Sequence, residues 1–73
     1  MRLPMLKPKE VVRILKRAGF EEMRQSGSHL ILANKETIKV VPVPMHSGDI
    51  KRGLLLGIIK QAGMTQEDFI QLR

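Results

Sequence analysis

Hydrophobic residues near the start of the chain recur at helical spacing. The apolar positions that share one face are Val11, Ile14, Leu15 and Ala18. Pro8 suits the first turn of such a helix, where its missing N–H would have no partner. Gly19 can adopt the left-handed conformation that ends a helix, and Phe20 can fold back onto it. The pattern predicts a helix over residues 8–18, with a basic outer side that carries Lys9, Arg13, Lys16 and Arg17.

Three short extended segments follow. Residues 22–25 predict an edge strand of low hydrophobicity, and residues 28–33 predict a second strand after a break at Ser26-Gly27. We expect a tight turn next, since Asn34 tolerates positive φ. Residues 37–43 are rich in β-branched side chains and predict the third strand. Its prolines lack amide donors, so this strand should fray early or lie partly at an edge.

Two further helices complete the pattern. Asp49 is expected to be the N-cap of a helix over residues 50–62, and Gly63 is expected to end it. Thr65 is expected to cap a short last helix that runs to Leu72. The residues of the longer helix that should face inward are Leu54, Leu55, Ile58, Ile59 and Ala62.

This order of elements predicts an α+β fold. A three-stranded antiparallel sheet with helices on one face is the simplest way to bury these apolar stripes. Double-stranded-RNA-binding domains have this architecture, although a shared fold does not itself establish a shared function. Seventy-three residues leave no room for a second core, so we expect a single domain over residues 1–73.

The composition narrows the location of the protein. The chain has no cysteine, which excludes disulfides and thiolate metal sites. No apolar run approaches the roughly 20 residues that span a bilayer, and the first residues show no secretory signal pattern. We therefore expect a soluble, cytoplasmic protein with no membrane partner.

The charge balance points to a polyanionic partner. Thirteen Lys and Arg against seven Asp and Glu give a formal net charge of +6, which is typical of proteins that bind nucleic acid or an acidic protein. There is no Trp or Tyr to stack on bases, so contacts to an RNA backbone should dominate. The charged residues of the second long helix are all basic, which makes Lys51 and Arg52 candidate phosphate contacts, with Lys39 as a further candidate. A solvated basic face is the alternative.

The two histidines are the candidate chemical groups. His29 follows Gly27 and Ser28 at the start of the second strand, where a glycine allows a ligand to approach closely. Histidine exchanges protons near neutral pH, so His29 is either a general acid or base or a surface residue without a role. His46 is either a second acid, base or phosphate contact, or a residue that orders its loop by hydrogen bonding.

The remaining residues do not suit a metal or a cofactor. Two isolated histidines and scattered carboxylates give no zinc or magnesium spacing, and the glycines stand singly rather than in a phosphate-binding loop. Metal-independent RNA cleavage is then the most economical enzymatic reaction. The 2′-OH of the substrate can attack the neighbouring phosphate, so the protein need supply only a base and positive charge.

Six segments carry a family resemblance, in content and in order. They are Gly19-Phe20, RQSGSH (24–29), VPVPMH (41–46), IKRG (50–53), IIKQAG (58–63) and MTQEDF (64–69). Together they resemble the HicA family, whose members are toxins of toxin–antitoxin modules, and they cover nearly the whole chain. The resemblance implies a double-stranded-RNA-binding-like fold, messenger RNA as substrate and neutralisation by a HicB antitoxin.

The resemblance also implies roles for single residues. The histidine of the Gly-Ser-His segment is catalytic in the family, which here is His29, and the Pro-x-His segment places His46 near the site. One position departs from the family pattern, because Leu54 stands where the family commonly has a threonine. A hydroxyl that could contact phosphate is lost there.

The sequence therefore predicts a ribosome-independent, metal-independent endoribonuclease toxin with His29 as its acid or base. A non-catalytic RNA-binding module of the same fold is the first alternative. A protein-interaction domain with an acidic partner is the second. Salt-sensitive binding of RNA separates these two alternatives, and turnover of RNA separates the enzyme from both.

Overall fold

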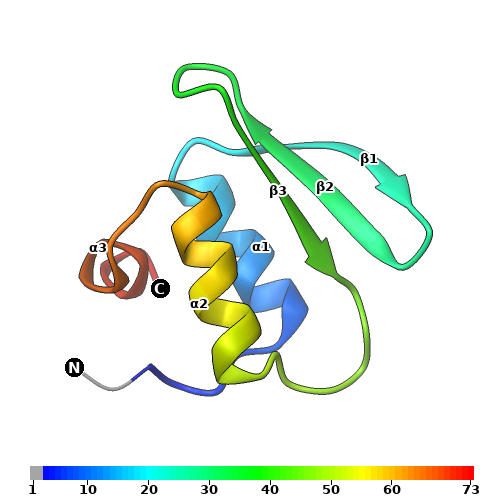
Figure 1. Ribbon diagram of the computed structural model, residues 1–73, viewed down its shortest axis with the longest axis vertical. Coiled ribbons are helices and arrows are strands. Elements are labelled where there is room, and N and C mark those ends of the chain that lie inside the picture. Colours follow the sequence, from blue (N-terminus) through cyan, green and yellow to red (C-terminus); the bar gives the residue numbers. More distant parts are fainter. Residues whose placement is uncertain (1–2) are drawn as a thin grey trace.

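The computed structural model describes residues 3–73 and confirms the predicted α+β fold (Figure 1). Three strands form one antiparallel sheet in the order β1-β2-β3. In chain order the elements are α1 (Pro8–Arg17), β1 (Glu21–Ser26), β2 (His29–Asn34), β3 (Lys39–Pro44), α2 (Arg52–Gln61) and α3 (Gln66–Gln71). The likeness to double-stranded-RNA-binding domains stays a prediction.

Helix α1 begins and ends as its sequence predicts. Pro8 is its first residue, and the Glu10 carboxylate accepts a hydrogen bond from the Lys7 backbone N–H at 3.2 Å. At the other end Gly19 has φ +100°, and its N–H donates to the Lys16 carbonyl while the Phe20 N–H donates to the Leu15 carbonyl. This pair of bonds is the Schellman motif, which satisfies the last carbonyl groups of a helix and returns Phe20 to the core.

The helices cover one face of the sheet, and they cover it unevenly. Both α1 and α2 pack against β3, while α3 packs against these two helices on the side away from the sheet (Figure 1). Leu32, Val41 and Val43 point into the core beneath the helices, and the residues that alternate with them form the outer face. All six residues of β1 are exposed, so the part of the inner face that lies next to this strand is not covered.

The turn between β2 and β3 differs from the prediction. Asn34 does not supply the positive φ; Ile38 does, at +55°, and it is the one non-glycine residue with positive φ within residues 3–73. The Asn34 side chain instead accepts hydrogen bonds from the N–H groups of Glu36 and Thr37, at 2.9 and 3.3 Å. This asparagine turn occupies four residues, so β3 begins at Lys39 rather than at residue 37.

The start of α2 was predicted two residues too early. Its N-cap is Lys51 rather than Asp49. The Ile50 N–H donates to the Leu6 carbonyl at 2.8 Å, and an Asp49 carboxylate oxygen lies 3.7 Å from the Lys7 ammonium nitrogen. The segment that precedes α1 therefore contacts both residues and holds Ile50 in a β-bridge outside the helix, an interaction across more than forty positions that local sequence does not reveal.

One inward-facing residue of α2 was also predicted wrongly. The buried stripe of this helix is centred on Leu55, Ile58, Ile59 and Ala62. Leu54 lies at the edge of that stripe, in the first turn, and 46% of its surface stays exposed. Its exposure places the position that departs from the family pattern at the surface of the protein.

None of the helices within residues 3–73 has both the length and the apolar character needed to cross a lipid bilayer.

Candidate functional site

His29 is the first residue of β2 and is held in place by a tight turn. Ser26 and His29 pair across the β1–β2 hairpin, so Gly27 and Ser28 are the two residues of the turn. Gly27 has φ +59° and Ser28 does not share that conformation, a pattern typical of type II′ hairpin turns with glycine first. The side chain of His29 is exposed on the outer face of the sheet, since its neighbour Leu30 faces the helices.

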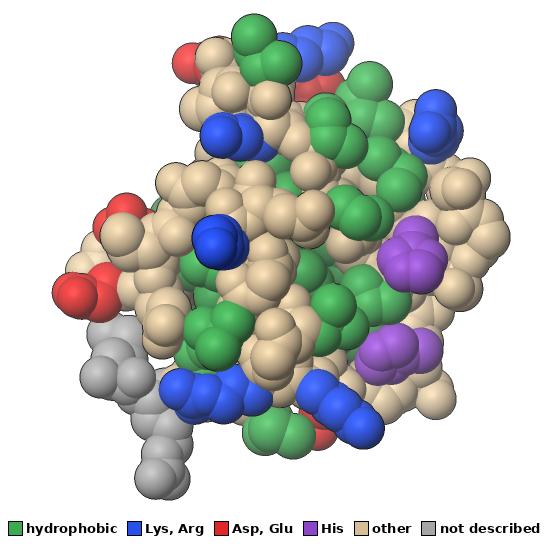
Figure 2. Space-filling model, in the orientation of Figure 1, with side chains coloured by type: hydrophobic (Ala, Val, Ile, Leu, Met, Phe, Trp, Pro, Cys, Tyr) green, Lys and Arg blue, Asp and Glu red, His purple; other side chains and the backbone are tan. Residues whose placement is uncertain are grey.

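His46 lies in the loop that follows β3, next to this turn. His29 is paired with Pro44, and the Met45 N–H donates to the Ser28 carbonyl oxygen at 2.7 Å. This bond ties the loop to the turn one residue before His46. Both histidines lie on the same face of the molecule (Figure 2).

Neither imidazole is engaged elsewhere in the protein. Among residues 3–73 no hydrogen bond or ion pair is formed by His29 or His46, and both side chains are exposed. Both ring nitrogens of each histidine can therefore reach a ligand. The alternative role of His46, ordering its loop by hydrogen bonding, has no supporting contact in the structure.

The candidate phosphate-binding residues fall into two places. Lys51 and Arg52 are exposed at the start of α2, and Figure 2 shows Lys or Arg side chains there on the face that carries the histidines. Lys39 is the first residue of β3, whereas Pro44, the partner of His29, is the last. Five residues of extended strand span about 17 Å. Lys39 instead lies beside Gly63, so the structure does not bring it to the histidines.

Sequence reasoning missed Arg24 as a site residue. Arg24 is paired with Ile31, and Ser26 is paired with His29, so Arg24 and His29 are diagonal neighbours on the outer face. Such neighbours lie about 7–8 Å apart, within reach of an arginine side chain. The alternation of residues along a strand was the signal that could have found it. A bulge between Glu22 and Arg24 lies on the other side of Arg24 from the turn, so the alternation from Arg24 to Ser26 is regular.

The site offers groups for proton transfer and positive charge. Within residues 3–73, no three His, Asp or Glu side chains are grouped as metal ligands would be. An exposed imidazole beside a guanidinium can exchange a proton with a bound phosphodiester and stabilise its charge.

Comparison with known proteins gives one family. The sequence model of the HicA toxins of bacterial toxin–antitoxin systems matches residues 8–64, from the first residue of α1 to just beyond α2. A comparison with curated proteins finds no match. The family match covers most of the chain and includes both histidines and the basic start of α2. The chain therefore belongs to the HicA toxin family, so it is the toxin of a toxin–antitoxin system and has a cognate antitoxin as its partner.

Proposed function

We propose that this toxin is an endoribonuclease that cleaves messenger RNA without a metal ion, with His29 as its proton-transferring group. The observation that carries the proposal is the position of His29. A type II′ turn holds this imidazole exposed, free of hydrogen bonds within residues 3–73 and diagonal to Arg24. The membership of the HicA family and the net charge of +6 support an RNA substrate.

The reaction needs few groups from the protein. The 2′ oxygen of the RNA forms a bond to the adjacent phosphorus, and the bond from phosphorus to the 5′ oxygen breaks. The 2′-OH gives up its proton to a base, and the leaving 5′ oxygen receives one from an acid. The products are a 2′,3′-cyclic phosphate and a 5′-hydroxyl, so neither an oxidant nor a protein nucleophile is required.

His29 takes one of these two proton transfers. A positioned acid or base of this kind typically contributes about 10²–10⁴-fold to the rate. Arg24 lies where it can stabilise the negative charge that develops on the phosphate oxygens. His46 is brought close to the site by the fold, and the bond from Met45 to Ser28 keeps its loop there.

Four further residues complete the proposed site. Gly27 and Ser28 form the turn, and their exposed backbone allows an RNA strand to approach His29 closely. Lys51 and Arg52, exposed at the start of α2, hold phosphates on either side of the scissile bond. Lys39 is not part of the proposed phosphate-binding site, because it lies at the end of β3 away from His29.

The proposal is tested by cleavage of a labelled messenger RNA in EDTA. Wild-type protein, His29→Ala and Arg24→Ala are compared with Lys35→Ala, a charge-matched control in the exposed turn between β2 and β3. We expect cleavage by the wild type and the control, none by His29→Ala, and about tenfold slower cleavage by Arg24→Ala. RNA affinity of His29→Ala should be nearly unchanged. Undiminished cleavage by His29→Ala would remove His29 from the chemistry.

A non-catalytic RNA-binding module is the second candidate function. The observation in its favour is Leu54, which is exposed in the first turn of α2 where the family commonly has a hydroxyl. Salt-sensitive RNA binding by the wild type without any cleavage would support this candidate. Cleavage gained by Leu54→Thr would then identify the lost hydroxyl as the cause.

The antitoxin partner is of the HicB type under this proposal. The family resemblance supports that assignment, and an acidic surface on the antitoxin would match the basic face of the toxin.

A further inference from the structure

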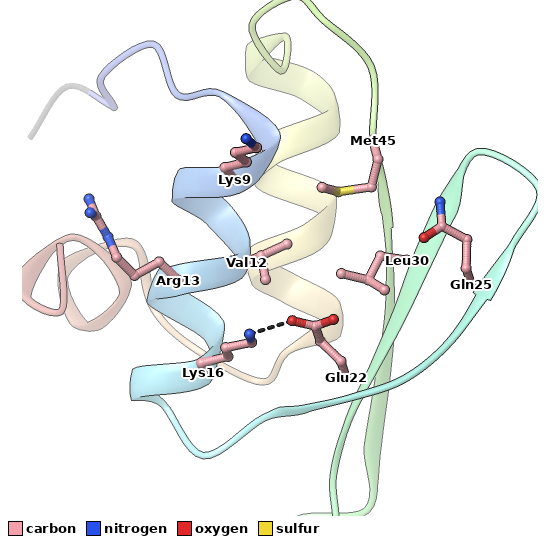
Figure 3. A pocket seen from close by; sticks show the side chains of 8 residues that line it. All are labelled: Lys9, Val12, Arg13, Lys16, Glu22, Gln25, Leu30 and Met45. Atoms are coloured by element: carbon pink, nitrogen blue, oxygen red, sulfur yellow. Dashed lines mark ion pairs between the residues drawn. The ribbon is translucent and has the colours of Figure 1, made fainter.

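A cleft opens where the helices leave β1 uncovered. It has a volume of about 440 Å³ and lies between α1 and the inner face of β1 and β2 (Figure 3). One wall is formed by Lys9, Val12, Arg13 and Lys16 from α1, and the other includes Glu22 and Gln25 from β1. The Arg13 side chain lies at the rim of the cleft, with its guanidinium directed away from the strands (Figure 3). The cleft lies on the opposite face of the hairpin from His29.

A second cleft, of about 480 Å³, continues the first past the start of α1. It is lined by Lys7 and Lys9 on one side and by His46 and Ser47 on the other. Lys9 and Met45 line both clefts, so the two adjoin. Together they form one groove, called here the α1 groove, which runs along α1 and ends at His46.

The charges along the α1 groove favour an anion. Lys16 is paired with Glu22, and Lys7 lies near Asp49. Lys9 and Arg13 are exposed and form no ion pair among residues 3–73. These two cations are therefore available to a ligand without breaking an existing contact.

The spacing of the cations favours a ligand with repeating negative charges. Lys9, Arg13 and Lys16 follow one another at four and three residues on one helix face, which corresponds to about 6 and 4.5 Å along the axis. The floor between the walls is apolar, formed by Leu30 and Met45 (Figure 3). A strand with phosphates on one side and sugars or bases on the other suits such a groove.

We propose that the α1 groove binds the backbone of single-stranded RNA on one side of the cleavage site, with Lys9 and Arg13 as its phosphate contacts. The inference rests on the proposed function, because the groove ends at His46 and the loop of His46 is tied to the turn that holds His29. An RNA strand that passes His29 and His46 continues into the groove. Lys9 and Arg13 are positioning residues, since neither reaches the scissile phosphate.

The binding test uses a 2′-O-methyl oligoribonucleotide, which lacks the attacking hydroxyl and is not cleaved. Lys9→Ala/Arg13→Ala is compared with Lys35→Ala/Lys60→Ala, which removes the same charge from exposed positions outside the groove. We expect the groove variant to lose about tenfold in affinity. The slope of log affinity against log salt should become shallower by about 1.4, the value for two phosphate contacts on a single strand. The control should change both quantities much less.

A second pair of variants tests whether RNA lies in the α1 groove, by an expected gain in RNA affinity. Glu22→Gln releases Lys16 inside the groove, whereas Glu21→Gln makes the same charge change on the outer face of the same strand. Because the net charge rises equally in both, a difference between them reports on the groove itself. We expect severalfold tighter RNA binding by Glu22→Gln than by Glu21→Gln.

The outcomes distinguish a failure of RNA binding in the α1 groove from a failure of the proposed RNA cleavage. If the groove variant binds RNA as well as its control does, the groove is not an RNA site, even where wild-type protein cleaves RNA. If that variant instead loses affinity only for the cognate antitoxin, the groove is a protein-docking surface and the proposal is overturned. If the groove variant alone binds RNA weakly and no protein cleaves it, the groove stands while the enzymatic function fails.

Discussion

Gly27 and His29 show how one backbone conformation can position a chemical group. Gly27 has φ +59°, which L-residues adopt only with strain, and this conformation closes the turn that places His29 opposite Pro44. The side chain of His29 has two rotatable bonds, but the position of the His29 Cα atom depends on the turn. A glycine two positions before the histidine is therefore part of the site although it carries no side chain.

Replacing Gly27 by alanine should weaken both folding and catalysis. No atom lies within 4 Å of the added methyl group, so the cost is that of the backbone alone, about 1–2 kcal/mol of unfolding free energy. Gly57→Ala is the matched control, because Gly57 lies inside α2 with equally open space. It should stabilise the protein by about 0.5–1 kcal/mol. Urea denaturation measures both changes, and equal effects of the two substitutions would contradict this account.

At the scale of the elements, Asn34 connects the end of α1 with the β2–β3 turn. Its amide nitrogen donates to the Ala18 carbonyl at 3.3 Å, and its oxygen accepts the two turn N–H groups. Asn34 is the one buried polar residue among the described residues, and all of its buried polar atoms have partners. The Asn34 side chain thus links the end of α1 directly to the β2–β3 turn through hydrogen bonds.

Asn34→Ala should lower the unfolding free energy by about 2 kcal/mol. The estimate follows from the loss of three hydrogen bonds, each worth about 0.5–1.5 kcal/mol, in a partly buried setting. Gln25→Ala removes an exposed amide with one long hydrogen bond of 3.4 Å and serves as the control. Its effect should stay below about 0.5 kcal/mol. Thermal or urea unfolding tests the difference, and a loss of the same size in both variants would contradict it.

The elements also explain why the cap at the end of α2 and the cap at the start of α3 could be predicted from the sequence. The Gly63 N–H donates to the Lys60 carbonyl and the Met64 N–H to the Ile59 carbonyl, which repeats the Schellman motif at the end of α2. The Thr65 hydroxyl accepts the Asp68 N–H at 3.1 Å at the start of α3. Each of these caps involves residues at most five positions apart. Local sequence contains all the groups that form them.

At the scale of the whole molecule, the net charge of +6 governs association. The cations lie on α1, on α2 and on the strands, so the excess of positive charge is spread over several elements. Such an excess attracts RNA, and it also speeds capture by an antitoxin of opposite charge.

Association with the cognate antitoxin should therefore slow as salt is added. Between low and physiological ionic strength we expect the association rate constant to fall about tenfold or more, while the dissociation rate constant changes less. Stopped-flow mixing of toxin and antitoxin over a salt series measures both constants. The Lys35→Ala/Lys60→Ala variant, with two charges fewer, should show a weaker salt dependence. A rate constant independent of salt would show that complementary charge does not guide this encounter.

The sequence by itself determined the order of the elements and most of their apolar faces. Helical and strand periodicity, glycine at the helix ends and glycine in the hairpin turn are local signals, so they can be read from neighbouring residues. The ordered motifs likewise indicated the HicA family, which the family match confirms. The proposed roles of His29, His46, Lys51 and Arg52 remain predictions.

The tertiary structure decided what depends on contacts between distant segments. The bond between Ile50 and Leu6 sets where α2 begins, and the pairing of β3 separates Lys39 from His29. The register of the β1–β2 hairpin, which pairs Ser26 with His29 and Arg24 with Ile31, decides that Arg24 shares a face with His29. The packing of both long helices on β3 leaves β1 bare and opens the α1 groove. These features arise from burial and pairing between segments far apart in the chain, and local residue patterns carry no information about such pairings.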